Sequence, residues 1–164
     1  MKIAKLKIEN YKEGYTVVEL LFYIALFALL SIVVIDAMIT MTKSFRETSI
    51  QAEWIQGSTI MERISREVRQ AEEVTTISAS SLELTNSGGT VEFVLSGTNI
   101  QFLENDVFTG DLNTANIVVT GLTFTQITTT VGEAVKIALT IRSTNDAQSR
   151  TQNFYNTVVL RGKY

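Results

Sequence analysis

The chain of 164 residues contains no cysteine and no histidine. Thiolate nucleophiles, imidazole bases and the commonest zinc and iron ligands are therefore missing from its chemistry. The remaining polar side chains form no recognisable catalytic grouping in the sequence. We therefore predict that the protein is not an enzyme and requires no cofactor.

Proline is also absent. A proline in the interior of a helix costs about 3 kcal/mol, so its absence permits a long helix without interruption. Neither sign of charge dominates, because 14 basic residues face 17 acidic ones and the net charge is -3. This balance predicts no nucleic-acid partner.

The chain opens with a short polar leader, residues 1–14, whose four lysines outnumber its two acids. An apolar run without charge follows from Leu20 to Ile35. Residues 15 to about 37 are long enough to cross a bilayer, which takes about 20 mostly apolar residues in a helix. Because the lysines precede this span, we expect a single-pass protein with its N-terminus in the cytoplasm and the remainder exported.

Glu19 lies at the edge of the apolar run. A carboxylate at the centre of a membrane helix costs about 2.5–3.5 kcal/mol on insertion scales, and somewhat less near an interface. No Lys or Arg follows within a helical turn to neutralise it. A cut after Gly14 would supply a cation, the new α-amino group of Tyr15.

The sequence Gly-Tyr-Thr-Val-Val-Glu-Leu-Leu over residues 14–21, followed by the apolar run, resembles the processing signal of type IV prepilins and type II secretion pseudopilins. The resemblance implies that a prepilin peptidase cuts between Gly14 and Tyr15 and that the new amine of Tyr15 is methylated. It also implies that Glu19 pairs with the terminal amine of a neighbouring subunit. These residues are the predicted cleavage, N-methylation and filament-assembly sites.

The same resemblance implies a structural subunit of a pilus or pseudopilus filament. Its partners would be prepilin peptidase, other pilin or pseudopilin subunits and an assembly platform in the inner membrane, with the globular part exported to the periplasm or cell surface. Two further segments, residues 61–71 and 154–162, are similar to minor pseudopilins of the J type. They favour a minor subunit over a major one.

Other interpretations of the N-terminus remain open at this stage. A secretory signal peptide has an apolar core of about 7–15 residues ending at a small-x-small site, whereas this run is longer and leads into Asp36 without such a site. A plain uncleaved anchor would leave Glu19 unexplained. The competing class of function is a single-pass anchored module whose β-rich domain binds a partner without joining a filament.

The helix is predicted to extend from residue 15 to about residue 73 and to become amphipathic beyond the membrane span. One face carries an apolar stripe at helical spacing: Trp54, Met61, Ile64, Val68 and Ala71. The other face carries the ion pairs Glu62 with Arg66 and Arg63 with Glu67, each four residues apart. Gly57 lies inside this helix, where it should weaken the helix by about 1 kcal/mol relative to alanine, and it suggests a bend.

Residues 74–164 are predicted to form a β-rich globular domain. Short segments alternate apolar with polar residues, as half-buried antiparallel strands do, and residues 86–89 and 96–99 have the composition of hairpin turns. We expect an α+β fold in which the second half of the helix packs on one antiparallel sheet.

One loop, residues 104–116, collects oxygen ligands of the kind that calcium prefers. Glu104, Asp106 and Asp111 are weak candidates for calcium ligands, and no other metal ligands are predicted. Their spacing does not fit an EF-hand loop, and Asp and Asn are common in turns. Turn formation is the simpler interpretation.

Overall fold

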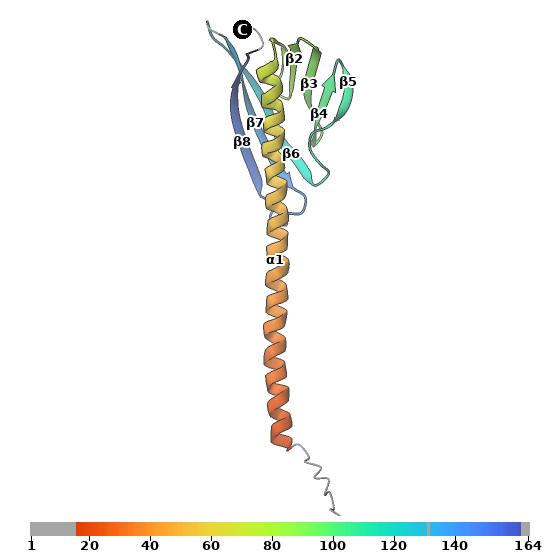
Figure 1. Ribbon diagram of the computed structural model, residues 1–164, viewed down its shortest axis with the longest axis vertical. Coiled ribbons are helices and arrows are strands. Elements are labelled where there is room, and N and C mark those ends of the chain that lie inside the picture. The colour runs from red at the N-terminus through yellow and green to blue at the C-terminus, as the bar shows by residue number, and fades with distance from the viewer. Residues whose placement is uncertain (1–15, 131, 162–164) are drawn as a thin grey trace, which may run out of the picture. The chain divides into compact units, whose positions relative to one another are not determined.

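A computed structural model describes residues 16–130 and 132–161 of the chain. Within them, one long helix precedes a series of antiparallel strands (Figure 1). The elements are α1 (Val17–Gln70), β1 (Glu73–Ile77), β2 (Ser81–Asn86), β3 (Gly89–Ser96), β4 (Asn99–Glu104), β5 (Val107–Asp111), β6 (Ile117–Thr128), β7 (Glu133–Ser143) and β8 (Thr151–Val159). The predicted α+β fold is confirmed.

The chain divides after Lys43 into two units, residues 1–43 and 44–164. In the described part of the first unit, α1 exposes nearly all of its apolar side chains. This stretch contains a candidate membrane span by length and composition. The rest of α1 belongs to the second unit, together with all the strands.

Helix α1 ends at Gln70 rather than near Glu73. The Ala71 amide still donates to the Glu67 carbonyl at 2.9 Å, but the next amide, that of Glu72, donates to Thr85 on β2 at 2.8 Å. Pairing with β2 thus replaces the helical hydrogen bond, and β1 begins at the following residue.

The strands form two antiparallel sheets rather than the one sheet expected from the sequence. The first has the order β1-β2-β3-β4-β5 and the second the order β6-β7-β8. The predicted hairpin turns at residues 86–89 and 96–99 connect β2 to β3 and β3 to β4. The alternation of apolar and polar residues does not mark strands β1 and β5, which lie at the two edges of the first sheet.

Asn113 joins the two sheets between β5 and β6. Its buried side chain accepts the Ile100 amide hydrogen at 2.9 Å and donates to the Ile117 carbonyl at 2.8 Å. Ile100 is the second residue of β4 in the first sheet, and Ile117 is the first residue of β6 in the second sheet. The amide therefore satisfies backbone groups at the junction where strand pairing stops.

The core lies between the second half of α1 and the inner faces of both sheets. The predicted stripe is confirmed, because Met61, Ile64, Val68 and Ala71 are buried in the core and Trp54 packs against it. Phe93 and Phe102 meet there with ring centroids 5.3 Å apart. Both ion pairs of the other helix face are present, at 3.9 Å for Arg66 with Glu62 and 3.2 Å for Arg63 with Glu67.

Gly57 does not interrupt the helix, since α1 continues through it. The residue is buried, and a Cβ placed there would lie 2.5 Å from the Phe154 ring and 2.7 Å from Cδ1 of Ile141. Close packing of the helix on β7 and β8 accounts for this glycine, not the suggested bend.

Candidate functional site

The predicted cleavage and methylation sites, Gly14 and Tyr15, lie outside the described residues. The description starts with Thr16, and the helix begins at the next residue. The predicted assembly residue Glu19 is in the first turn of α1. The described part of this site is therefore the start of the helix.

Thr16 caps the N-terminus of α1. Its hydroxyl oxygen accepts the Glu19 amide hydrogen at 3.3 Å, and its carbonyl accepts the Leu20 amide hydrogen at 3.1 Å. A threonine followed three residues later by glutamate is a capping-box pattern, and a carboxylate in the first turn interacts favourably with the helix dipole. The sequence itself carries this signal, since Glu19 follows Thr16 at the spacing of a capping box.

The Glu19 side chain has a partner one turn along the helix. The Tyr23 hydroxyl donates to Oε1 of Glu19 at 3.0 Å. Tyr23 was not predicted as part of the site, although its spacing of four residues places it on the same helix face. A neutral hydroxyl satisfies one acceptor position but leaves the negative charge of the carboxylate in place.

The apolar segment beyond this turn satisfies its own polar groups. The Ser31 hydroxyl donates to the Phe27 carbonyl at 2.8 Å, and the Thr42 hydroxyl donates to the Met38 carbonyl at 2.9 Å. Such bonds make hydroxyls compatible with a hydrocarbon environment. In the sequence from Thr16 to Ile35, Glu19 is the single residue with a charged side chain.

The three calcium candidates are not brought together. Among the residues that the structure describes, no three acidic side chains are grouped so as to hold a metal ion. Asp111 instead accepts a hydrogen bond from Nδ2 of Asn99 at 2.8 Å. Asn105 and Asp106 have φ values of 50° and 63°, the left-handed conformation that Asn and Asp tolerate in tight turns.

The loop between β7 and β8 docks on α1. Glu53 accepts hydrogen bonds from the Ser143 hydroxyl and from Nδ2 of Asn145. Arg150 binds Glu47 at 2.9 Å and Asp146 at 2.9 Å, and its guanidinium lies 5.4 Å from the centre of the Trp54 ring. Hydrogen bonds from Arg150, which outweigh the effect of burial, lower the pKa of Asp146 to about 2.

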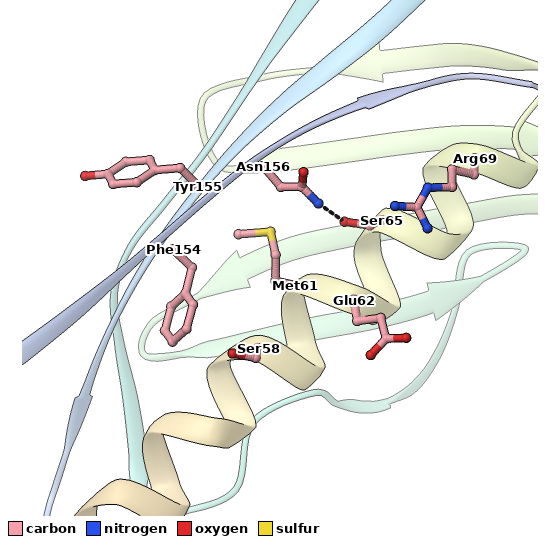
Figure 2. A pocket seen from close by; sticks show the side chains of 8 residues that line it. All are labelled: Ser58, Met61, Glu62, Ser65, Arg69, Phe154, Tyr155 and Asn156. Carbon is pink, nitrogen blue, oxygen red and sulfur yellow. Dashed lines mark hydrogen bonds between the residues drawn. The ribbon is translucent and has the colours of Figure 1, made fainter.

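A groove of about 240 Å³ lies beside β8 (Figure 2). Its lining, which we call the α1–β8 groove, consists of Ser58, Met61, Glu62, Ser65, Arg69, Phe154, Tyr155 and Asn156. Figure 2 shows Met61 and Phe154 along its apolar part and Asn156 donating to the Ser65 hydroxyl across it, at 2.8 Å. The sequence did not predict this feature, because it joins segments far apart in the chain.

Comparisons with known proteins add no relative. No protein-family model, no curated protein and no solved structure matches this chain.

Proposed function

We propose that this chain is a structural subunit of a filament of the type IV pilus or type II secretion pseudopilus class. In this proposal, prepilin peptidase cuts the precursor between Gly14 and Tyr15, and Tyr15 is methylated. The mature chain then assembles from the inner membrane. One observation carries the proposal: Glu19 stands in the first turn of an exposed apolar helix, within the stretch of residues 14–21 that resembles a prepilin processing signal.

The Glu19 carboxylate links processing to assembly, because cleavage creates the amine with which it would pair. In a membrane, the Tyr23 hydroxyl does not neutralise Glu19, and a lone α-amino group is equally costly. Cleavage after Gly14 would create an amine four residues before the carboxylate, and a neighbouring subunit would present its own amine in the same way. Pairing of the two charges would remove both costs and set the register between subunits.

The order of elements supports the same proposal. A long helix with an apolar first part, followed by antiparallel strands, is the order of pilin-like subunits. The proposed partners are prepilin peptidase, other subunits and the assembly platform, and the proposed work is mechanical rather than enzymatic. The resemblance of residues 61–71 and 154–162 to minor pseudopilins favours a minor subunit.

The second candidate is an anchored binding module, which the free sheet edges and the α1–β8 groove would suit. Substitution of Gly14 by a bulky residue separates the two proposals. A filament subunit loses both cleavage and assembly in this variant. An unchanged N-terminus together with unchanged assembly would favour the anchored module.

The charge of Glu19 is tested by a set of variants expressed in a host with a prepilin-processing system. Glu19→Ala and Glu19→Gln are both expected to insert into the membrane but to fail in filament incorporation, measured by recovery in sheared filament fractions. Tyr23→Phe removes the hydroxyl but keeps the carboxylate, and it should incorporate. Asp36→Ala removes the next acid along α1 and serves as the matched control.

Normal incorporation of Glu19→Gln would contradict the pairing of charges, because glutamine keeps the side-chain oxygen and loses only the negative charge. Loss of membrane insertion in Glu19→Ala would also contradict it, since removal of a carboxylate should make insertion easier.

A further inference from the structure

Two exposed apolar side chains stand on the edge strand β5. Val107 and Phe108 leave 66% and 55% of their surfaces accessible. Phe108 ends a row of cross-strand neighbours, Glu83, Glu92, Leu103 and Phe108, that runs over β2, β3, β4 and β5. An exposed aromatic ring at the edge of a sheet offers a large apolar area to a partner that has a pocket for it.

The surroundings of Phe108 are acidic. Its own hairpin, β4–β5 (residues 99–111), carries Glu104, Asp106 and Asp111, and the sequence has no Lys or Arg between Arg69 and Lys136. Glu83 and Glu92 lie directly opposite each other on the same sheet face, an arrangement that is destabilising without a cation nearby. Arg63 of α1 lines a pocket with Glu104 and Asp111, but it is also paired with Glu67 at 3.2 Å. This surface therefore combines an apolar projection with more acidic than basic groups.

The α1–β8 groove has the complementary properties. An apolar cavity of about 150 Å³ can hold a benzene molecule, so a groove of about 240 Å³ has room for one phenyl ring. Arg69 lines it and forms no ion pair within the described part of the chain. The one acid of its lining, Glu62, faces Arg66 at 3.9 Å, and the Arg161 amide bonds to the Arg69 carbonyl at 3.2 Å.

We propose that the β4–β5 hairpin of one copy of this chain docks into the α1–β8 groove of a second copy, with Phe108 in the groove and Asp111 beside Arg69. The hairpin includes β5 and the groove is lined by β8, which are edge strands of different sheets. Strands β5 and β8 lie on opposite sides of α1 in Figure 1. Contacts between two different patches do not close into a symmetric dimer. They repeat from copy to copy and generate a linear assembly.

This inference rests on the proposed function, because membrane-anchored copies in a filament are held in one orientation and at high local concentration. It requires at least two neighbouring copies of the same chain in one filament.

Engineered cysteines test the contact directly, because the natural chain has none. Full-length Phe108→Cys and Ser58→Cys chains with different tags are expressed together and oxidised with copper phenanthroline. Phe108→Cys with Thr59→Cys is the matched control, since Thr59 is exposed beside Ser58 but does not line the groove. The mixed disulfide should form with Ser58→Cys at least about five times more than with the control.

Charge variants of the same pair test the polar part of the contact. Arg69→Glu or Asp111→Lys should each lower the yield of mixed disulfide about two- to fivefold, as expected for an exposed ion pair. Combining Arg69→Glu on the Ser58→Cys chain with Asp111→Lys on the Phe108→Cys chain should restore it.

Equal yields with Ser58→Cys and Thr59→Cys, or no mixed disulfide at all, would overturn the inference. Failure of the charge exchange to restore the yield would overturn the pairing of Asp111 with Arg69. Intact mass of the same sample reports the proposed function separately. A chain that begins at Tyr15 without the disulfide contradicts only the contact, whereas a chain that retains its leader contradicts only the proposed processing.

Discussion

Asp146 shows how single side chains fix the β7–β8 loop to the helix. Its carboxylate is buried and accepts hydrogen bonds from the amides of Gln148 and Arg150 and from the Arg150 guanidinium. The same guanidinium reaches Glu47 on α1 and covers the Trp54 ring. Ionised Asp146 therefore organises both the loop and its attachment.

Acid should release this loop. The pKa of Asp146 is lowered from 3.8 to about 2 in the folded state, first by hydrogen bonds from Arg150. A lowered pKa contributes stability above the unfolded value, and that contribution disappears as the pH falls through the folded value. We expect Trp54 emission of the detergent-solubilised chain to be constant from pH 8 to about pH 5 and to change as the pH falls from about 4 to 2.

Asp146→Asn should remove that acid transition and show an altered Trp54 environment already at pH 7. Glu62→Gln is the control. Glu62 is an exposed acid on α1, the helix that carries Trp54, and this variant should behave as the natural chain. The same acid transition in Asp146→Asn would show that other carboxylates hold the loop.

Gly57 has no room for a side chain between α1 and the strands β7 and β8. Gly57→Ala improves helix propensity by about 1 kcal/mol, but overpacking against Phe154 and Ile141 typically costs about 1–3 kcal/mol. We expect a net loss of up to about 2 kcal/mol in the free energy of unfolding, measured by urea titration of Trp54 fluorescence. Ser58→Ala changes the exposed neighbour and should lose no stability. A gain in Gly57→Ala would mean that α1 does not pack tightly on β7 and β8.

Among the elements, the junction between the two sheets depends on Asn113. Asn113→Ala leaves the Ile100 amide and the Ile117 carbonyl without their partner, at about 1–3 kcal/mol for each buried group. Hydrogen exchange of the Ile100 amide should become at least about ten times faster. Thr114→Ala removes only an exposed bond to Gln56 and should leave this exchange rate unchanged. Unchanged exchange in Asn113→Ala would exclude the junction role.

Sequence patterns predicted the elements that have one buried face. The stripe of α1 and the alternation in β2, β3, β4 and β7 arise because each element buries one face. The period at which apolar residues recur in the sequence therefore predicts the type of element. Strand β5 has no buried side chain to produce alternation, and its residues were interpreted as a loop with oxygen ligands. The division into two sheets was not predicted either, because it is defined by which strands pair, and no local pattern reveals the bridge that Asn113 makes between Ile100 and Ile117.

At the scale of the whole molecule, the sequence is organised as an apolar, exposed helix segment followed by a unit with its own core. Gly14, Tyr15 and Glu19 could be named from their spacing in the sequence, and their roles in cleavage, methylation and assembly stay predictions. The α1–β8 groove and the acidic β4–β5 hairpin could not be named in this way, since each requires strands to be placed side by side. In the proposed filament, the apolar helix segments would be held by charge pairing in the membrane, and the β-rich units would be held by docking of the hairpin into the groove.

The N-terminus of the mature chain distinguishes a processed filament subunit from an uncleaved anchor and from a secreted protein. Intact-mass and N-terminal peptide analysis of membrane-extracted protein, from a host with prepilin peptidase, should show a chain that lacks residues 1–14 and begins with N-methylated Tyr15. The matched Gly14 variant should retain its leader. A natural chain that still begins at Met1, or that has been cut after the apolar run beyond Ile35, would contradict the account.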